Sequence, residues 1–283
     1  MFLVVAIWGG NWANMKIGLN YVSPMNLLWQ RLFFSTFMIA PLLLLCRNGI
    51  KWEFKTIGIL AVAAASWVFS NVFMMFALGA ENSGISAILT YTQPLFVFGL
   101  SAIFLRGEIT KVKLGSALLG FAGIGVIYIE QLGGGGAFSA IIYLVLSAFL
   151  WAVSIVGYKL VSDVVHPYWM SFIEVALGSF LLLPFALSTG GISFPTELPY
   201  VLSVGYMTVL ATAVAFVLWF DLLKNEDAVT VSSSSLMVPI VAFIVGAALL
   251  GEMINSYQVV GILMVLTGVY FVNRKNNIKK IPS

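Results

Sequence analysis

The stretch SAIIYLVLSAFLWAVSIVGYK, residues 139–159, decides the fold class of this chain. It carries one charged residue, Lys159, at its last position. At a rise of about 1.5 Å per residue, a helix of this length crosses the hydrocarbon core of a bilayer, which is about 30 Å thick. Comparable apolar stretches are 2–20, 25–46, 56–79, 84–105, 114–130, 168–188, 199–222, 228–250 and 256–273. The sequence therefore predicts an all-α polytopic membrane protein with ten transmembrane helices.

The composition excludes most other classes of protein. The 283 residues are 61% apolar and 9% charged, and their mean hydropathy is +1.03. A soluble domain is about 45–50% apolar and about 25% charged, so this chain has too few charges to cover a water-facing surface. A net charge of +3 provides no basic footprint for nucleic acid, and the one cysteine, Cys46, excludes an intrachain disulfide.

The basic residues indicate an orientation in the membrane. If the connections alternate between the two sides, Lys16 falls on one side and Arg31 lies inside a stretch. The other side receives the remaining 12 of the 14 basic residues: Arg47, Lys51, Lys55, Arg106, Lys111, Lys113, Lys159, Lys224, Arg274, Lys275, Lys279 and Lys280. Because cytoplasmic loops carry the excess of Lys and Arg, we expect both termini to be cytoplasmic.

The chain contains an internal repeat. At an offset of 143 residues the aligned pairs are Trp8 with Trp151, Lys16 with Lys159, Pro24 with Pro167, and Pro41 with Pro184. After shifts of one or two residues, the pairs Pro94 with Pro239 and Gly107-Glu108 with Gly251-Glu252 also align. The repeats are predicted at 1–130 and 139–273, joined by a Gly-rich linker at 131–138 and followed by a basic cytoplasmic tail at 274–283.

The repeat predicts a transport architecture. Five helices is an odd number, so the second repeat must enter the membrane inverted relative to the first. Inverted repeats are typical of secondary transporters, which bind substrate near the bilayer midplane and alternate access by rocking.

The order of these residues resembles the EamA-type members of the drug/metabolite transporter superfamily. The first repeat matches at Trp8-Gly9-Gly10-Asn11, Lys16, Ser23-Pro24, Arg31, Pro94 and Gly107-Glu108. The second repeat matches at Trp151, Lys159, Pro167, Pro239, Gly251-Glu252, Gly261 and Gly268, but has Glu174 where an Arg would be expected. The resemblance implies an exporter of amino acids or other small metabolites in the plasma (inner) membrane of a prokaryote.

Polar side chains inside the stretches are candidate cavity residues, because in hydrocarbon they need a partner or water. One face of the stretch 139–159 comprises Ser147, Trp151, Ser154 and Tyr158, at helical spacing. Candidates in other stretches are Asn11, Asn14, Ser83, Ser86, Thr90, Tyr91, Gln93, Thr208, Thr212 and Trp219. The alternative is that these groups form hydrogen bonds between helices, as Ser, Thr and Asn commonly do in membranes.

Arg31 and Glu174 are charges well inside a stretch, each seven residues after the proline that opens it. Three arrangements are open. The two residues form a structural ion pair, they hold the carboxylate and amine of a zwitterionic substrate, or each has separate local partners.

Other residues have expected structural roles. Pro94 and Pro239 are candidate hinges, because each removes a hydrogen bond within its helix. Glu108 and Glu252 are expected at the N-termini of the helices that follow them. Lys16 and Lys159 are expected to snorkel from helix ends, and His166 to lie in a turn.

The leading hypothesis is a secondary transporter that exports a small metabolite such as an amino acid. No hydrolase, protease, P-loop or dinucleotide motif is present, so we expect no enzyme, cofactor or metal site. A lipid-linked-sugar or multidrug flippase-like carrier of the same fold is the alternative; an intramembrane enzyme or a channel fits less well. The expected partners are a small-molecule substrate and membrane lipid, and no nucleic acid. The sequence leaves open proton coupling and the oligomeric state.

Overall fold

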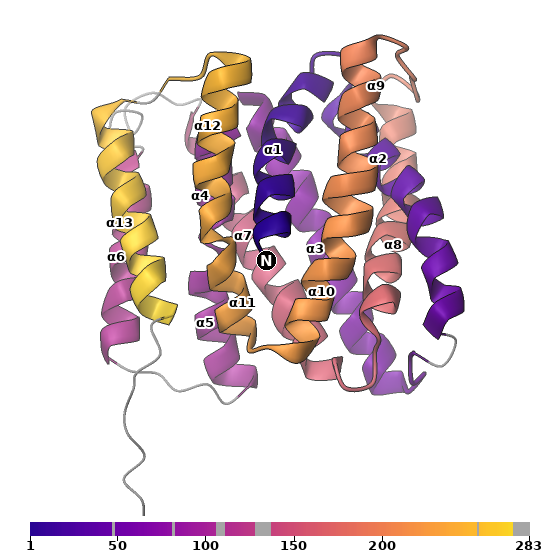
Figure 1. The fold of residues 1–283 in the computed structure, drawn as a ribbon, viewed down its shortest axis with the longest axis horizontal. Coiled ribbons are helices and arrows are strands. Elements are labelled where there is room, and N and C mark those ends of the chain that lie inside the picture. Colours follow the sequence, from indigo (N-terminus) through magenta and orange to yellow (C-terminus); the bar gives the residue numbers. More distant parts are fainter. Residues whose placement is uncertain (47–48, 81–82, 106–110, 128–136, 254, 274–283) are drawn as a thin grey trace, which may run out of the picture.

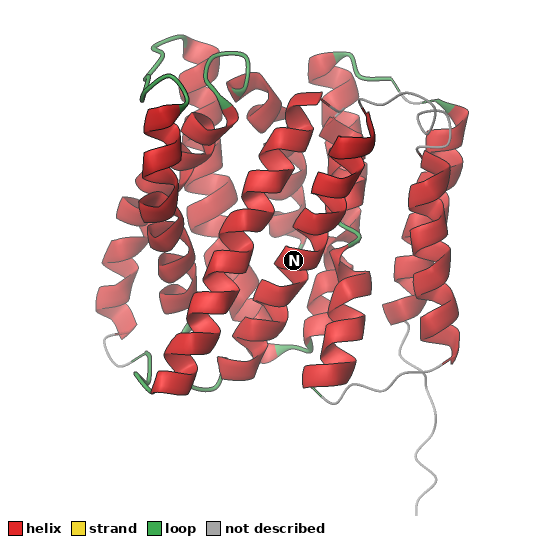
Figure 2. Cartoon of the chain, turned by 180° about the vertical axis from the view of Figure 1, so that it is seen from behind, coloured by secondary structure: helices red, strands yellow, loops and turns green. Residues whose placement is uncertain are grey.

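A computed structural model describes residues 1–46, 49–80, 83–105, 111–127, 137–253 and 255–273. Over these residues the protein is a bundle of helices (Figures 1 and 2). The α-helices are α1 (Phe2–Gly18), α2 (Pro24–Ile39), α3 (Phe54–Ala80), α4 (Ser83–Thr90), α5 (Gln93–Phe104), α6 (Lys111–Ile127), α7 (Ala137–Val161), α8 (Pro167–Ser188), α9 (Leu198–Gly205), α10 (Ala215–Asn225), α11 (Ala228–Ser234), α12 (Val238–Leu250) and α13 (Ser256–Asn273). Two short 3-10 segments are η1 (Ala40–Cys46) and η3 (Ser235–Met237), and η2 (Tyr206–Val214) is π-helical.

The helices have the length and composition of membrane spans. In the described part of the chain, six helical stretches are long and apolar enough to cross a bilayer: Pro24–Cys46, Phe54–Gly79, Ser83–Phe104, Ser139–Val161, Pro167–Ser188 and Leu198–Asn225. Shorter apolar helices are Leu114–Gly123, Val238–Leu250 and Ser256–Gly268. The chain is therefore a multi-pass membrane protein, and each stretch predicted from the sequence is mainly helical over its described residues.

Two of the predicted helices are broken, and both breaks precede a proline. The stretch 84–105 divides into α4 and α5, and Pro94 lies in the first turn of α5. The stretch 228–250 divides into α11, η3 and α12, and Pro239 lies in the first turn of α12. Proline is accommodated there because the first N–H groups of a helix have no intrahelical acceptor.

The prolines that open α2 and α8 follow equivalent caps. The backbone N–H of Asn26 donates to the Ser23 hydroxyl at 3.3 Å. The backbone N–H of Tyr168 donates to Nδ1 of His166, also at 3.3 Å. His166 is therefore an N-cap of α8 as well as a turn residue. Burial, followed by the nearby charge of Lys224, lowers the pKa of His166, which favours the neutral acceptor form.

The helices pack in pairs. α3 lies along α7, α2 along α8, α1 along α12, and α6 along α13, the last two forming one edge of the bundle in both views (Figures 1 and 2). Glycines allow the close approaches that membrane helices commonly use. A Cβ at Gly157 of α7 would lie 2.9 Å from Cβ of Ala63 in α3, and one at Gly268 of α13 would lie 2.5 Å from the Ser116 carbonyl oxygen in α6.

Candidate functional site

A cavity lies in the centre of the bundle, where helices of both halves of the sequence meet. About 440 Å³ of space lies between its lining atoms, open solvent included, and about 50 Å³ of this space is open to the centre of a water molecule. Its lining is Trp8, Asn11, Trp12, Met15, Arg31, Trp67, Ser70, Asn71, Met74, Thr90, Tyr91, Trp151 and Phe216. The lining is mainly aromatic, with a few polar groups and one cation.

A smaller hollow adjoins this cavity, with about 240 Å³ between its lining atoms, open solvent included, of which about 10 Å³ is open to the centre of a water molecule. The side chains that line both spaces are Trp8, Trp67, Trp151 and Phe216. The smaller hollow adds Ser154, Ile155, Glu174, Trp219 and Phe220. Aromatic side chains therefore form the boundary between a space that contains Arg31 and a space that contains Glu174.

The aromatic boundary is held together by edge-to-face and tilted ring contacts. The ring centroids of Trp8 and Trp151 are 5.8 Å apart, those of Trp67 and Phe216 are 5.0 Å apart, and those of Tyr91 and Trp151 are 5.2 Å apart. The indole N–H of Trp8 donates to the Ala211 carbonyl oxygen at 3.0 Å, which fixes the orientation of that ring. Such pairs add about 0.5–1.5 kcal/mol each beyond their buried area.

Arg31 is buried and is oriented by its neighbours. Its Nε donates to the Thr212 hydroxyl at 2.8 Å, and one terminal nitrogen lies 3.8 Å from the sulfur of Met15. The Thr212 hydroxyl in turn donates to the Met207 carbonyl oxygen at 2.8 Å. A guanidinium has five N–H donors, so these contacts leave donors for a ligand in the cavity that Arg31 lines.

Glu174 is completely buried and only half satisfied. The Ser154 hydroxyl donates to Oε1 of Glu174 at 2.7 Å, whereas Oε2 has no hydrogen-bond partner among the described residues. A buried polar oxygen without a partner costs free energy that a ligand's donor or a proton would recover. Within the described chain Arg31 and Glu174 do not pair with each other, so the structure shows separate local partners for the two charges.

The structure brings most of the predicted site residues to these two spaces. Asn11, Arg31, Thr90, Tyr91 and Trp151 line the larger space, and Trp151, Ser154 and Glu174 line the smaller one. Thr212 lines neither space and instead orients Arg31.

The predictions for Asn14, Gln93 and Tyr158 as cavity residues are not matched by their positions. The amide of Asn14 donates to the Gly10 carbonyl one turn earlier in α1, at 2.9 Å. Gln93 is buried outside both linings. Tyr158 is fully buried against Phe220, with a ring distance of 4.9 Å. Helical spacing places Tyr158 on the same face of α7 as Trp151. That face lines the cavity at Trp151 but packs against a neighbouring helix at Tyr158.

α3 contributes cavity residues that were not among those predicted from the sequence. The cavity residues of this helix are Trp67, Ser70, Asn71 and Met74. Their helical spacing, with two polar residues in an apolar span, is the signal that could have identified them. Ser70 also donates to the carbonyl oxygen of Ser147 at 2.8 Å. The first residue of the predicted polar face of α7 therefore takes part in a hydrogen bond between helices.

The π-helical segment η2 was also missed. π-Helical turns are rare and are often found at functional sites. Here the segment contains Ala211 and Thr212, which position Trp8 and Arg31 respectively. No sequence pattern used above identifies such a segment.

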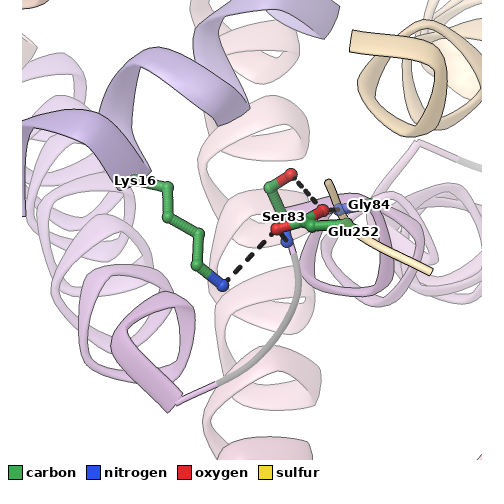
Figure 3. A network of polar contacts seen from close by, with 4 residues as sticks. All are labelled: Lys16, Ser83, Gly84 and Glu252. Atoms are coloured by element: carbon green, nitrogen blue, oxygen red, sulfur yellow. Dashed lines mark hydrogen bonds and ion pairs between the residues drawn. The ribbon is translucent and has the colours of Figure 1, made fainter. Parts of the chain in front are cut away.

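A polar network lies at the end of α1, one residue beyond the cavity residue Met15 (Figure 3). Nζ of Lys16 is 3.5 Å from Oε1 of Glu252. The same carboxylate accepts hydrogen bonds from the backbone N–H and hydroxyl of Ser83, both at 2.7 Å, and from the N–H of Gly84 at 3.3 Å. Glu252 therefore caps α4, whereas the sequence predicted that it would cap the helix that follows it. Lys16 forms an ion pair, whereas the sequence predicted that it would snorkel from the helix end. Glu108 lies outside the described residues.

Lys159, the repeat counterpart of Lys16, makes a different set of contacts. Its ammonium donates to the carbonyl oxygens of Leu223, Lys224 and Glu226, at 2.8, 3.3 and 2.7 Å. These carbonyls lie at the C-terminal end of α10, so Lys159 caps that helix. Lys16 and Lys159 lie near opposite ends of the bundle, where α1 and α7 end (Figure 1).

A profile of the EamA-like transporter family matches residues 1–129 and 138–274. The chain belongs to this family. It is thus a membrane transporter for small molecules and not an enzyme, as the sequence predicted.

Relatives of the transporter span nearly its whole length. It is 27% identical to a "Probable amino-acid metabolite efflux pump" of Salmonella typhimurium, covering 95% of this chain and 91% of that protein. It is 28% identical to an "Uncharacterized transporter" of Archaeoglobus fulgidus, covering 97% and 96%. A protein of known crystal structure shares the fold, with a TM-score of 0.71 at 16% identity over 96% of this chain and 94% of that one.

Proposed function

We propose that this transporter exports an amino acid, or a metabolite with the same two charged groups, from the cytoplasm. The observation that carries the proposal is the placement of Arg31 and Glu174 in adjoining spaces with only aromatic side chains common to both. The substrate carboxylate binds the free donors of Arg31. Its ammonium group donates to Oε2 of Glu174, which lacks a partner among the described residues.

The aromatic boundary suits the remainder of such a substrate. Indole and phenyl faces accept an apolar side chain, and they also attract an ammonium group that passes close to the ring face. Trp151 reaches both spaces and therefore contacts the substrate between its two charged ends. Efflux-pump relatives at 26% and 27% identity support an amino-acid substrate.

The proposed architecture is ten transmembrane segments in two inverted repeats, 1–130 and 139–273, joined by the linker 131–138. The family profile matches the chain in two segments, which supports this division. The packing supports it as well. α3 and α5 both contact α7, and their equivalents in the second repeat, η2 and α12, both contact α1. In addition, α2 packs against its own counterpart α8, and α6 packs against its own counterpart α13.

The proposed orientation places both termini toward the cytoplasm of a prokaryotic cell, with the tail 274–283 on that side of the inner membrane. The excess of basic residues on one face supports it. Lys16 and Glu252 then lie at the outer face and Lys159 at the cytoplasmic face.

The proposed mechanism is alternating access. Glu252 belongs to the second repeat, whereas Lys16, Ser83 and Gly84 belong to the first, so this network holds the two halves together at the outer face. Its separation opens the cavity outward. The helix breaks before Pro94 and Pro239 are the proposed hinges, because backbone hydrogen bonding is already interrupted there.

Efflux of radiolabelled amino acids from proteoliposomes tests this function. A panel of amino acids, measured with and without a pH gradient, identifies the substrate and any proton coupling. We expect saturable efflux of at least one amino acid, which excess unlabelled substrate inhibits. Efflux equal to that of protein-free vesicles for the whole panel would contradict the proposal.

One observation favours the second candidate, a lipid-linked-sugar or multidrug flippase-like carrier. An apolar groove of about 580 Å³ lies between α3, α5 and α7. A carrier of lipid-linked cargo would move a fluorescent phospholipid between leaflets of the same proteoliposomes. An amino-acid exporter would leave that lipid in its original leaflet.

A further inference from the structure

The groove between α3, α5 and α7 has an almost uniformly apolar lining. Its residues are Phe54, Lys55, Gly58, Ile59, Val62, Leu100, Phe104, Phe149, Val153, Val156, Gly157 and Leu160. Lys55 is the charged member of this set. The three helices belong to stretches long and apolar enough to cross a membrane, so the groove faces the hydrocarbon of the bilayer.

The groove exists because of how two glycines are placed. Gly157 allows α3 to approach α7 closely, since a Cβ there would lie 2.9 Å from Cβ of Ala63. α5 packs against α7 as well, so α7 forms the floor of the groove and α3 and α5 form its walls. Gly58 contributes no side chain to the wall, and a Cβ at that position would meet no described atom within 4 Å.

The dimensions of the groove match one leaflet. Along α3 it extends from Phe54 to Val62, a rise of about 12 Å at about 1.5 Å per residue. One leaflet contributes about half of the hydrocarbon thickness of about 30 Å. The groove thus has the length of a lipid chain in a single leaflet.

The charge of the groove lies at one end. Lys55 is exposed, in the first turn of α3, and Lys51, four residues earlier, is exposed as well. A lysine at this depth places its ammonium group among lipid headgroups. Basic residues beside a gap between membrane helices attract anionic headgroups, which are enriched at the cytoplasmic leaflet.

We propose that this groove binds one acyl chain of an anionic phospholipid, with the lipid phosphate at Lys55. The inference rests on the membrane placement and orientation given under the proposed function, and it adds a lipid partner to them. The lipid is a resident partner and not the cargo. Because α3 and α7 also supply Trp67 and Trp151 to the cavity, the bound lipid contacts the helices that form the substrate site.

Native mass spectrometry of the purified chain in detergent, titrated with phosphatidylglycerol or phosphatidylcholine, tests the proposal. We expect about fivefold tighter binding of phosphatidylglycerol, the difference that about one lysine contributes near a membrane surface. Gly58→Leu fills the groove and should weaken phosphatidylglycerol binding about tenfold or more. Gly99→Leu is the matched control, since Gly99 is also open but lies outside the groove lining.

A second pair of variants tests the headgroup contact. Lys55→Gln should remove the preference for phosphatidylglycerol, whereas Lys111→Gln, an exposed lysine that does not line the groove, should retain it. All variants are first checked for an unchanged thermal unfolding midpoint. Equal binding of the two lipids by the unaltered protein, or equal weakening by both glycine variants, would overturn the proposal.

Transport is not the readout, so the two proposals fail separately. A chain that binds phosphatidylglycerol selectively but transports no amino acid would refute the proposed function alone. A chain that exports amino acids without a lipid preference would refute the lipid site alone. Movement of labelled phosphatidylglycerol between leaflets would identify the lipid as cargo and overturn its role as a resident partner.

Discussion

Arg31 and Glu174 occupy corresponding positions in the two halves of the chain, yet their surroundings differ. Arg31 is held by Thr212 and Met15, on the segment η2 and on α1. Glu174 has one hydroxyl donor, from Ser154, and a second oxygen without a described partner. The protein thus orients its cation through two contacts and leaves one carboxylate oxygen without a described partner, where we propose that the substrate ammonium donates.

The two repeat-related lysines show the same kind of difference. Lys16 contacts a carboxylate from the other half of the chain, whereas Lys159 contacts carbonyl oxygens at the end of α10 in its own half. A contact between halves must change when the halves move, and a contact within one half need not. Under the proposed mechanism, the contact of Lys16 is therefore movable and the contacts of Lys159 are structural.

The largest effect is expected at Arg31. Arg31→Gln removes the charge that binds the substrate carboxylate and should lower kcat/KM for efflux about 10- to 150-fold, since hydrogen bonds to charged groups contribute about 1.5–3 kcal/mol. Arg31→Lys keeps the charge but loses the planar group of donors, so it should recover part of the activity. Initial efflux rates from proteoliposomes measure both. Unchanged efflux by Arg31→Gln would remove this residue from the site.

A smaller effect is expected at the aromatic boundary. Trp151→Ala removes a side chain that lines both spaces and should lower kcat/KM about tenfold. Tyr158→Phe, in the same helix, removes a hydrogen bond of 3.4 Å to Val165 outside the cavity and should leave efflux unchanged. If Trp151→Ala lowered the unfolding midpoint while the folded fraction transported normally, Trp151 would be a packing residue.

The lysines should separate in a stability measurement. Lys159→Gln removes three hydrogen bonds from an ammonium group to carbonyl oxygens at the end of α10 and should cost about 1–3 kcal/mol in the free energy of unfolding. Lys16→Gln should cost about 0.2–1 kcal/mol, because its side chain is 29% exposed. Lys16→Gln should also raise labelling of a cysteine at the cavity residue Thr90 in a Cys46→Ser background, as the outer face opens more often. Equal stability losses with no change in labelling would contradict the distinction between movable and structural contacts.

The smallest effect concerns the caps of α2 and α8. The pKa of His166 is lowered in the folded state, so its contribution to stability is present above the unfolded pKa of about 6.5 and is lost as the pH falls from that value through the lower pKa of the folded state. Asp221 opposes this shift. His166→Asn keeps a capping side chain without titrating, so its unfolding midpoint should fall less than that of the unaltered protein between pH 7.5 and about pH 5. An identical fall in both proteins would show that other groups cause the pH dependence.

Much of the fold could be predicted because membrane burial imposes simple rules on sequence. Length and hydropathy identified the helical stretches, and Pro94 and Pro239 marked the places where two of them break. Five of the predicted residues line the larger cavity. Polar groups in membrane spans are rare and usually face the interior of the bundle or a cavity, so their positions in the sequence were informative.

The missed features depend on tertiary geometry. η2 differs from an α-helix by a small change in hydrogen-bond register, which Trp8 and Arg31 stabilise from other helices. The Glu252 carboxylate reaches Ser83 because the chain folds back over 169 residues, which no local pattern records. Tyr158 shares a helical face with Trp151, but the cavity ends between them.

The central claim is that Arg31 and Glu174 bind opposite ends of one substrate. It is tested most directly by competition for efflux with three ligands: the transported amino acid, its carboxyl amide, and its analogue without the amine. Arg31→Gln should weaken inhibition by the amino acid and by the analogue without the amine while leaving the amide unaffected, and Glu174→Gln should spare only the analogue without the amine. If each variant weakened all three ligands by the same factor, the two residues would not read separate ends of the substrate, and the proposed site would be wrong.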